Sequence, residues 1–378
     1  MSRKTLGLSR RGFFAAVGSA AAAGALFGRA GAAAGEEAQA KAAAALEIPT
    51  RRMGRTNVQV SVISGNETMS DPALVEAAID AGVNYWHKAG AYLGPALKKY
   101  GREKLYVEIC LDPSGSAEKD VENFKKHLGK WIDYADFYKI HGSYNEKSAE
   151  AFKKLKEQGL AKYLAASFHR YDDALKALKT GNLDQVQVGG CPVSGEPLAK
   201  VLAAAKEADA GVILMKTMQG GEKAWAGEKF KKVLEPYAQQ GLKPCQAVTA
   251  ACLATDGVTT LVVITESIQR LNLLAEAASK TAGKTVTVRP AVTGPAAFCT
   301  VCGKCKGVCP KGIAVQDILR AEMYAVGYGE PARGRNLYAS IDKSSRAGVC
   351  SKCGSCTKAC PYRVASPERI AAAAAILA

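Results

Sequence analysis

The chain has 378 residues, of which 48% are apolar and 23% charged, and these ordinary globular values allow one large domain and one small one. The 51 Lys and Arg residues outnumber the 35 Asp and Glu residues and give a formal net charge of +16. Many lysines fall in helical runs such as 152–158 and 228–234, so we interpret them as solvated helix faces and expect no nucleic-acid partner. A basic surface that docks an acidic partner protein is the alternative.

Residues 1–34 have the pattern of an export signal. Arg10 and Arg11 form a twin-arginine pair, and an apolar stretch rich in Ala and Gly follows from Phe13 to Phe27. This stretch is short for a membrane span, and small residues at 32–34 offer a cleavage site after Ala34. We therefore predict export through the twin-arginine route to the periplasm, with no transmembrane span in the mature chain. A disordered basic leader before an alanine-rich helix is the alternative.

Residues 35–49 are low in complexity and are predicted to be a linker. From residue 50 to residue 284, strand-like and amphipathic helix-like segments alternate, which predicts a parallel sheet and, with eight strands, a (β/α)8 TIM barrel. An open doubly wound α/β sheet is the alternative, although no Gly-rich phosphate fingerprint follows the first strand. The strand candidates are 58–63, 83–88, 104–111, 136–141, 161–168, 183–189, 211–217 and 259–265.

Two cysteine motifs follow a second predicted linker at 285–298. "CTVCGKCKGVCP" at 299–310 and "CSKCGSCTKACP" at 350–361 share the spacing of four cysteines and a final proline that is typical of 4Fe-4S cluster binding. Because the segments between and after the motifs look helical, we predict that 285–378 form a small, mainly helical two-cluster ferredoxin-like domain. Two structural zinc sites with four thiolates each are the alternative.

The ligands of the two predicted clusters are expected to cross between the motifs. In two-cluster ferredoxins the fourth cysteine of each run ligates the cluster of the other run. The predicted metal ligands are therefore Cys299, Cys302, Cys305 and Cys360 for one cluster, and Cys350, Cys353, Cys356 and Cys309 for the other.

Several segments of the predicted barrel occur in the order found in a known family. They are "RRMGRTNVQVSVI", "AGVNYWHKAGAYLG", "DFYKIHG", "SFHR", "DQVQV" and "GVILMKTMQGG". This ordered set resembles the aldo/keto reductase family over residues 50–280, and "SFHR" resembles its iron–sulfur-bearing branch. The resemblance implies a TIM barrel with a catalytic tetrad of Asp, Tyr, Lys and His and a nicotinamide cofactor that supplies hydride.

The tetrad that the resemblance implies is only partly present. Tyr92 and His141 match its Tyr and His, whereas His87 stands at the Asp position and Cys110 at the Lys position. The missing lysine normally lowers the pKa of the tyrosine. For His87, a catalytic role and a hydrogen-bonded structural role are both open. Cys110 is interpreted first as an inert filler, and a metal site of His87, Cys110 and His141 is a further alternative.

The nicotinamide site is also altered. Ser167 and Gln187 match family residues that hold the nicotinamide amide, but the segment 265–274 is too short and lacks the clamp for the adenosine phosphate. We therefore expect NADPH to bind weakly or not at all. His169 lies outside the tetrad and is expected at the edge of the barrel mouth.

The alternation of side chains along strands predicts one interior contact independently of the resemblance. If Cys110 and His141 face the interior, then Glu108 and Lys139, two residues earlier on neighbouring strands, face it too. A buried charge needs a partner, so we predict an ion pair between Glu108 and Lys139.

These observations lead to three functional hypotheses. The first is an exported iron–sulfur oxidoreductase of aldo/keto reductase type, in which electrons pass through two 4Fe-4S clusters to or from a small carbonyl substrate. The second is a non-catalytic electron-transfer subunit whose barrel docks a redox partner protein. The third is an NADPH-dependent carbonyl reductase.

Overall fold

The structure is a computed structural model that describes residues 47–281, 299 and 301–377, apart from 130, 143, 219, 222–224, 362–363 and 365. The predicted signal at 1–34 and the linker at 285–298 lie outside the described residues, as does all but the end of the linker at 35–49. The chain begins its described part with a β-hairpin. Strand β1 (Thr50–Arg52) pairs antiparallel with β2 (Gln59–Ser61), and Arg51 lies opposite Val60.

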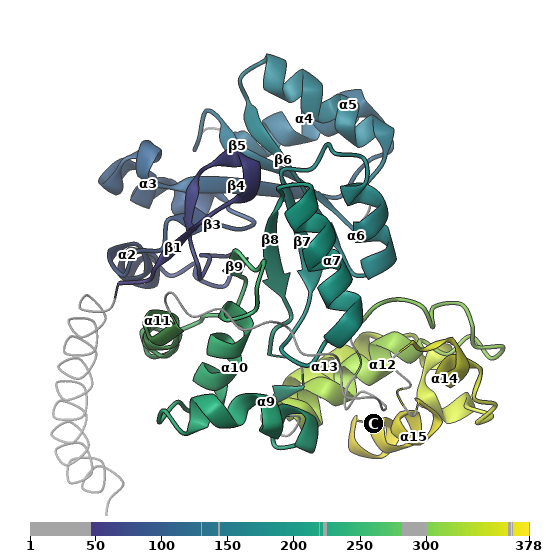
Figure 1. Ribbon diagram of the computed structural model, residues 1–378. Helices are drawn as coiled ribbons and strands as arrows, with labels where there is room; N and C mark the ends of the chain where they lie inside the picture. The colour runs from purple at the N-terminus through teal and green to yellow at the C-terminus, as the bar shows by residue number, and fades with distance from the viewer. Residues whose placement is uncertain are drawn as a thin grey trace, which may run out of the picture.

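A curled parallel sheet of seven strands follows the hairpin (Figure 1). Its strands lie in chain order, so each one is hydrogen-bonded to the next and the crossovers place helices on the outer face. The strands are β3 (Tyr85–Trp86), β4 (Tyr106–Leu111), β5 (Ala135–His141), β6 (Ala161–Phe168), β7 (Gln185–Gly189), β8 (Gly211–Met215) and β9 (Thr260–Leu261).

The expected closed barrel of eight strands is corrected to this seven-stranded curled sheet. The predicted first strand, 58–63, instead supplies β2 of the hairpin, because its Val60 turns toward the sheet interior with Met53. The segment that follows makes two isolated parallel bridges, from Ile63 to Leu261 and from Gly65 to Trp86. No eighth strand of the parallel sheet is present among the described residues.

Helices cover the outer face of the sheet and follow the predicted alternation. Several begin at side-chain N-caps: the Asp71 carboxylate accepts from the N–H of Leu74, and the Asn145 amide oxygen accepts from the N–H of Ser148. The helical elements are α2 (Pro72–Asp80), η2 (Ala91–Leu93), α3 (Gly94–Tyr100), α4 (Ala117–Leu128), α5 (Glu146–Glu157), α6 (Tyr171–Leu178), α7 (Gly195–Glu207), α9 (Glu228–Ala238), α10 (Pro244–Leu253) and α11 (Ile268–Thr281).

The two faces of the sheet carry different side chains. On β4, Val107 and Ile109 belong to the large hydrophobic core between the sheet and its helices. On the inner face, a smaller core fills the amino-terminal end of the curled sheet with Met53, Val60, Tyr85, Phe137, Ala165 and Ile213. The strand parity that was predicted from the sequence is therefore present, and the polar inner residues lie above this apolar plug.

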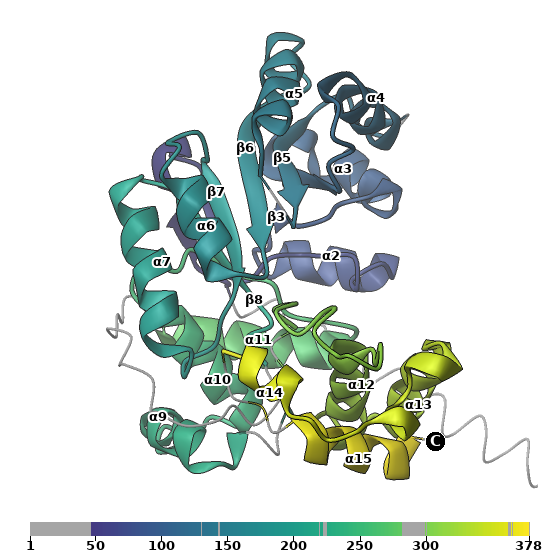
Figure 2. The same cartoon turned by 90° about the vertical axis from the view of Figure 1, so that its right-hand side faces the viewer.

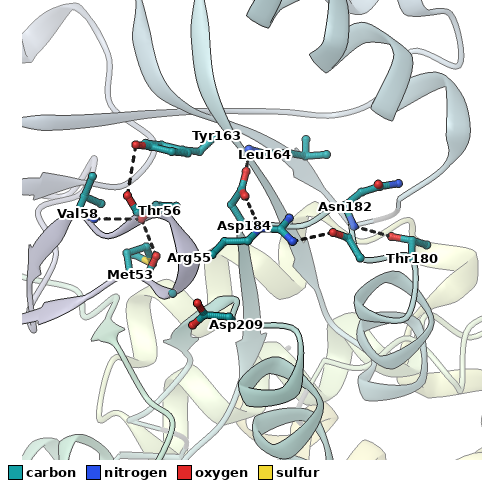
Figure 3. A network of polar contacts seen from close by, with 12 residues as sticks. Met53, Arg55, Thr56, Val58, Tyr163, Leu164, Thr180, Asn182, Asp184 and Asp209 are labelled. Carbon is teal, nitrogen blue, oxygen red and sulfur yellow. Dashed lines mark hydrogen bonds and ion pairs between the residues drawn. The ribbon is translucent and has the colours of Figure 1, made fainter.

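A polar network holds the hairpin at the amino-terminal ends of the strands (Figure 3). Arg55 Nε donates to an Asp184 carboxylate oxygen at 2.7 Å, and the other oxygen accepts from the backbone N–H of Leu164 at 2.8 Å. The N–H of Arg55 also donates to the carbonyl of Asp209 at 2.6 Å. These bonds hold the hairpin against the amino-terminal ends of β6 and β7.

The C-terminal region has its own small core. Its helical elements are α12 (Val315–Glu322), the π-helical turn η4 (Met323–Gly327), α13 (Pro331–Ser340), η5 (Lys343–Ser345), η6 (Ala347–Val349), α14 (Ser355–Ala359) and α15 (Ser366–Leu377). Ile318 and Leu319 of α12 pack with Ile370 and Ala373 of α15, and Arg369 forms an ion pair with Glu322. Figure 2 shows these helices on the side toward which the strands run. None of the helices in the described parts of the chain is both long and apolar enough to cross a membrane.

Candidate functional site

Glu108 is the centre of a buried polar network on the inner face of the sheet. One carboxylate oxygen lies 2.5 Å from Lys139 Nζ and accepts the hydroxyl of Tyr85, and the other lies 2.6 Å from His87 Nδ1. Burial works to raise the pKa of Glu108, but Lys139 and then His87 outweigh it and hold the pKa well below its usual range. The predicted ion pair between Glu108 and Lys139 is confirmed, and both side chains are fully buried.

His87 and Gln187 are bound into the same network. His87 Nδ1 lies 3.2 Å from Lys139 Nζ, and Lys139 also donates to the side-chain oxygen of Gln187. Burial, followed by the charge of Lys139, lowers the pKa of His87, so the ring is neutral and its Nδ1–H donates to Glu108. This geometry favours the structural interpretation of His87. It also engages the side-chain oxygen of Gln187, the residue that the resemblance assigned to a nicotinamide amide.

Cys110 and Ser167 lie in two successive rows of the sheet register. Cys110 is directly opposite Lys139 in the sheet register, and Ser167, which is buried, lies between His141 and Gln187. Burial raises the pKa of the Cys110 thiol to about 12, so the thiol stays protonated and is a poor nucleophile or metal ligand. Among the residues that the structure describes, no group of three His, Cys, Asp or Glu side chains is placed to hold a single metal ion.

Tyr92 and His141 are not brought into contact. Tyr92 lies in η2, where its ring meets Trp86 edge to face with 6.4 Å between centroids. Its hydroxyl is buried and has no hydrogen-bond partner among the described residues, and burial, with Glu67 adding to it, raises its pKa. His141 ends β5, and its Nδ1 lies 2.6 Å from a carboxylate oxygen of Asp112.

A row of polar side chains crosses the carboxyl ends of the strands. The His141 ring packs edge to face on His169 with 5.8 Å between centroids, and His169 Nδ1 accepts from Lys216 Nζ at 3.1 Å. Burial and then Lys216 lower the pKa of His169 to about 4, so this ring is neutral. From the sequence, His169 was expected at the edge of the barrel mouth, and Asp112 and Lys216 were not identified. Asp112 directly follows the predicted strand 104–111, and Lys216 lies near the end of the predicted strand 211–217.

The first cysteine motif surrounds a cavity together with the last cysteine of the second motif. The cavity is lined by Cys299, Cys302, Cys305 and Cys360, with Gly303, Lys304, Gln316, Leu319 and Val364. The backbone N–H of Val301 donates to Cys299 Sγ at 3.3 Å. Four thiols around one space fit a 4Fe-4S cluster, whose ligands are thiolates supported by N–H···S bonds.

The two motifs repeat an unusual backbone conformation. Val301 and Lys352, each directly before the second cysteine of its motif, have φ of 58° and 54°. The glycine that follows this cysteine, Gly303 or Gly354, also has a positive φ. A left-handed backbone is rare for residues other than glycine and is most costly for a β-branched residue such as Val301, so its repetition at Lys352 indicates that the two loops share one shape. In the second set, Cys356 is buried, Cys353 is exposed, and Cys309 and Cys350 are half-buried against the C-terminal core.

The C-terminal region meets the strand ends through the loop after β8. An added Cβ on Gly221 would collide with the carbonyl of Gly327, and Tyr328 packs against the large core of the sheet domain. Burial, followed by Arg320, lowers the pKa of Lys216 to about 8, while the thiols of Cys299 and Cys302 act to raise it. Lys216 therefore lies within electrostatic reach of the first motif and also contacts the row of histidines.

The comparison with protein families supports this reading of the C-terminal region. A family model of the 4Fe-4S dicluster domain matches residues 298–365, which contain both cysteine motifs. A search of curated proteins finds no match to the chain. The C-terminal part of the chain is thus a 4Fe-4S dicluster domain, and iron–sulfur electron transfer is the activity that this domain supports.

Proposed function

We propose that the protein is an exported iron–sulfur oxidoreductase of aldo/keto reductase type. It passes electrons through two 4Fe-4S clusters to or from a small carbonyl substrate at the carboxyl ends of the strands. The observation that carries the proposal is the cavity lined by Cys299, Cys302, Cys305 and Cys360, in a region whose Gly327 packs against Gly221 in the loop after β8. The clusters would be held by Cys299, Cys302, Cys305 and Cys360, and by Cys350, Cys353, Cys356 and Cys309.

The residues at the strand ends have the chemistry to bind and protonate a carbonyl compound. Reduction of a carbonyl to an alcohol takes two electrons and two protons, and two bound 4Fe-4S clusters would supply one electron each. His141, held by Asp112 through Nδ1, leaves its other ring nitrogen for a proton transfer to the substrate oxygen. Tyr92, whose hydroxyl has no hydrogen-bond partner among the described residues, would supply the second proton to the carbonyl carbon.

Export is part of the proposal and rests on Arg10 and Arg11 in the predicted signal. The clusters would be assembled in the cytoplasm, so that the cysteines are ligated before they reach an oxidising compartment. A redox partner protein would then exchange electrons with the clusters, because a periplasmic enzyme is not expected to have a supply of NADPH.

Substrate-dependent reoxidation of the clusters tests the proposal. Protein purified without oxygen is reduced with dithionite, freed of excess reductant and mixed with short aldehydes or ketones, while the visible absorption of the clusters is followed. We expect reoxidation by a carbonyl compound, slowed roughly 10²-fold or more in His141→Gln because a proton donor is lost. The exposed His127→Gln serves as the matched control. Reduced clusters that no carbonyl compound reoxidises would contradict the proposal.

A second candidate is a non-catalytic electron-transfer subunit whose sheet domain docks a partner. It is favoured by the neutral thiol of Cys110 and by the engagement of His87 with Glu108, which leave little of the implied tetrad. In this case the clusters would cycle with a protein or dye acceptor at the same rate in the parent and in a His141→Gln, Tyr92→Phe double variant.

The third candidate, an NADPH-dependent carbonyl reductase, has less support. The side-chain oxygen of Gln187 already accepts from Lys139, and no lysine stands at the position of Cys110. NADPH titration separates this candidate from the other two.

A further inference from the structure

The second cysteine motif lies in an exposed segment of the C-terminal region. From Gly348 to Cys353 every residue is exposed except Cys350, which is half-buried. Val349 is one of the few large apolar side chains that are exposed in the described parts of the chain, at 47%. Helix α14 follows this segment and lies at the outer edge of the C-terminal region (Figure 1). Cys353, a proposed cluster ligand, is therefore open to a molecule that approaches from solution.

The two cysteine motifs carry lysines and no acidic residue. Residues 299–312 and 350–361 contain no Asp or Glu, and their five lysines are Lys304, Lys306, Lys311, Lys352 and Lys358. All five are exposed. The ion pairs within the described C-terminal region join Arg333 to Glu330 and Arg369 to Glu322, so none of these lysines is neutralised there.

Exposed lysines on helices of the sheet domain are placed differently. Lys200 on α7 pairs with Glu196 at 2.8 Å, and Lys280 on α11 pairs with Glu276 at 2.6 Å. Each motif lysine instead lies one or two residues from a cysteine, so its Cα is at most about 7.6 Å from the Cα of that cysteine. Unpaired positive charge is thus concentrated at the proposed cluster ligands.

We propose that the segment 348–353, with Lys358 on α14, is the docking surface for a redox partner protein that presents an acidic surface. The inference rests on the proposed function, because it requires the second cluster to be bound. A reduced partner gives one electron to this cluster, so the partner is oxidised and the cluster reduced by one electron, and no bond or proton moves. The lysines attract the acidic partner, and Val349 offers an apolar contact beside these charges, as in small electron-transfer interfaces.

The exposed Cys353 favours a redox protein over a nucleic acid at this surface. A nucleic acid would bind the lysines through its phosphates and would gain nothing from a cluster ligand that is open to solvent. An electron carrier needs a close approach to the cluster, and Cys353 provides it.

Electron exchange with two carrier proteins of opposite charge tests the docking surface. Protein purified without oxygen is mixed with a reduced plant-type ferredoxin, which is acidic, and dithionite-reduced protein is mixed with oxidised cytochrome c, which is basic. Visible absorption gives the second-order rate constants. Between about 50 and about 500 mM salt, we expect the ferredoxin rate to fall roughly tenfold and the cytochrome c rate to rise, because salt screens attraction and repulsion respectively.

Charge reversal at the second motif should remove the attraction. Lys352 has a φ of 54°, so Asp, which tolerates left-handed backbone, is the suitable replacement. The double variant Lys352→Asp, Lys358→Glu should lower the ferredoxin rate at low salt roughly tenfold. The matched control Lys147→Asp, Lys153→Glu reverses two exposed lysines on α5, has the same net charge and should react as the parent. If the reversal lowers the iron content, the neutral variant Lys352→Asn, Lys358→Gln should show a smaller loss of rate.

The outcomes separate the inference from the proposed function. Equal ferredoxin rates in the two double variants, or a parent that exchanges electrons with neither carrier, would overturn the inference. A duplex oligonucleotide that binds the parent but not the motif variant would also overturn it, because the lysines would then serve a nucleic acid. Reoxidation by carbonyl compounds involves no partner protein and tests the proposed function by itself. A parent protein that binds no iron would overturn both.

Discussion

The ammonium nitrogen of Lys139 lies 2.5 Å from a carboxylate oxygen of Glu108, and both side chains are closed off from solvent. The two residues lie on neighbouring strands, β4 and β5, and both point into the curled sheet. Each charge compensates the other, and the contacts with Tyr85, His87 and Gln187 satisfy the remaining polar atoms. The pair is therefore a fully compensated buried ion pair on the inner face of the sheet.

Removing one partner of this pair should destabilise the sheet domain strongly. We expect Glu108→Gln or Lys139→Met alone to lower the free energy of unfolding by about 3–5 kcal/mol, because each leaves a charge buried without its partner. The double variant should lose less than the sum of the two single losses. Denaturant unfolding followed by tryptophan fluorescence measures all three, and single variants as stable as the parent would show that the pair is not needed.

The neutral state of His87 predicts a loss of stability in mild acid. Because its folded pKa lies below the ordinary 6.5, the unfolded chain binds more protons below that value, and stability falls as the pH is lowered from about 7 to about 5. Lys139 opposes protonation, whereas Glu108 and Glu67 favour it, and burial decides the balance. In His87→Gln the difference in unfolding free energy between the two pH values should shrink.

Two other histidines define the controls for this measurement. The pKa of His169 is also lowered, so it contributes a loss of the same sign, which should remain in His87→Gln. His127 is exposed on α4, and His127→Gln should behave as the parent. An unchanged pH dependence in His87→Gln would mean that His87 has the same pKa in the folded and the unfolded chain, and would contradict the prediction.

The contacts that the sequence could predict are those set by strand periodicity. Side chains alternate along a strand, so the inward direction of Glu108 and Lys139 follows once their strands are aligned. The alternation of side chains over 58–63 fits a hairpin strand as well as it fits a strand of the parallel sheet. Only the packing of Val60 inside the sheet shows that this segment belongs to the hairpin. That is why an eighth strand was expected where the structure has β2.

The contacts that escaped prediction lie in loops. Lys216 follows β8 and His169 follows β6, and β7 lies between these strands, so their hydrogen bond spans a strand that neither belongs to. The bond depends on the left-handed backbone conformation of Lys216, and the pattern of hydrophobic residues in the sequence does not predict such a conformation. The protonated state of Cys110 likewise depends on burial, which the sequence does not measure.

The cluster ligands should cross between the motifs. Cys360 lines the cavity of the first motif, so Cys360→Ala should perturb the cluster whose other ligands are Cys299, Cys302 and Cys305. Cys309→Ala should perturb the other cluster. The parent should contain about eight iron atoms, and paramagnetic resonance of the reduced variants should show a different cluster altered in each. Damage confined to the motif that carries the substitution would refute the crossed assignment.

Export should depend on the arginine pair in the predicted signal. Replacing both Arg10 and Arg11 by lysine should retain the protein in the cytoplasm at full length, because the twin-arginine route reads the pair itself. Cell fractionation and the mass of the mature protein measure the outcome, with Arg29→Lys as the control outside the pair. Equal amounts of periplasmic protein from the double variant would remove the export step from the proposal.

NADPH should bind weakly or not at all. The side-chain oxygen of Gln187, which the resemblance assigns to the nicotinamide amide, is occupied by Lys139. Cys110 stands where a lysine would lower the pKa of Tyr92, and burial instead raises the pKa of this tyrosine. Only residues 262–267 connect β9 to α11, so most of the segment 265–274 is already part of α11, and a longer clamp for an adenosine phosphate is not formed there.

Titration of NADPH into the anaerobic protein, followed by fluorescence, measures this directly. We expect no saturation at micromolar NADPH and no oxidation of the nucleotide when a simple aldehyde is added. Dithionite-reduced protein should still transfer electrons to its substrate under the same conditions, because the clusters supply them. Saturable binding with turnover of the aldehyde would instead assign the strand ends to an ordinary nicotinamide-dependent reductase, and the clusters would then need another role.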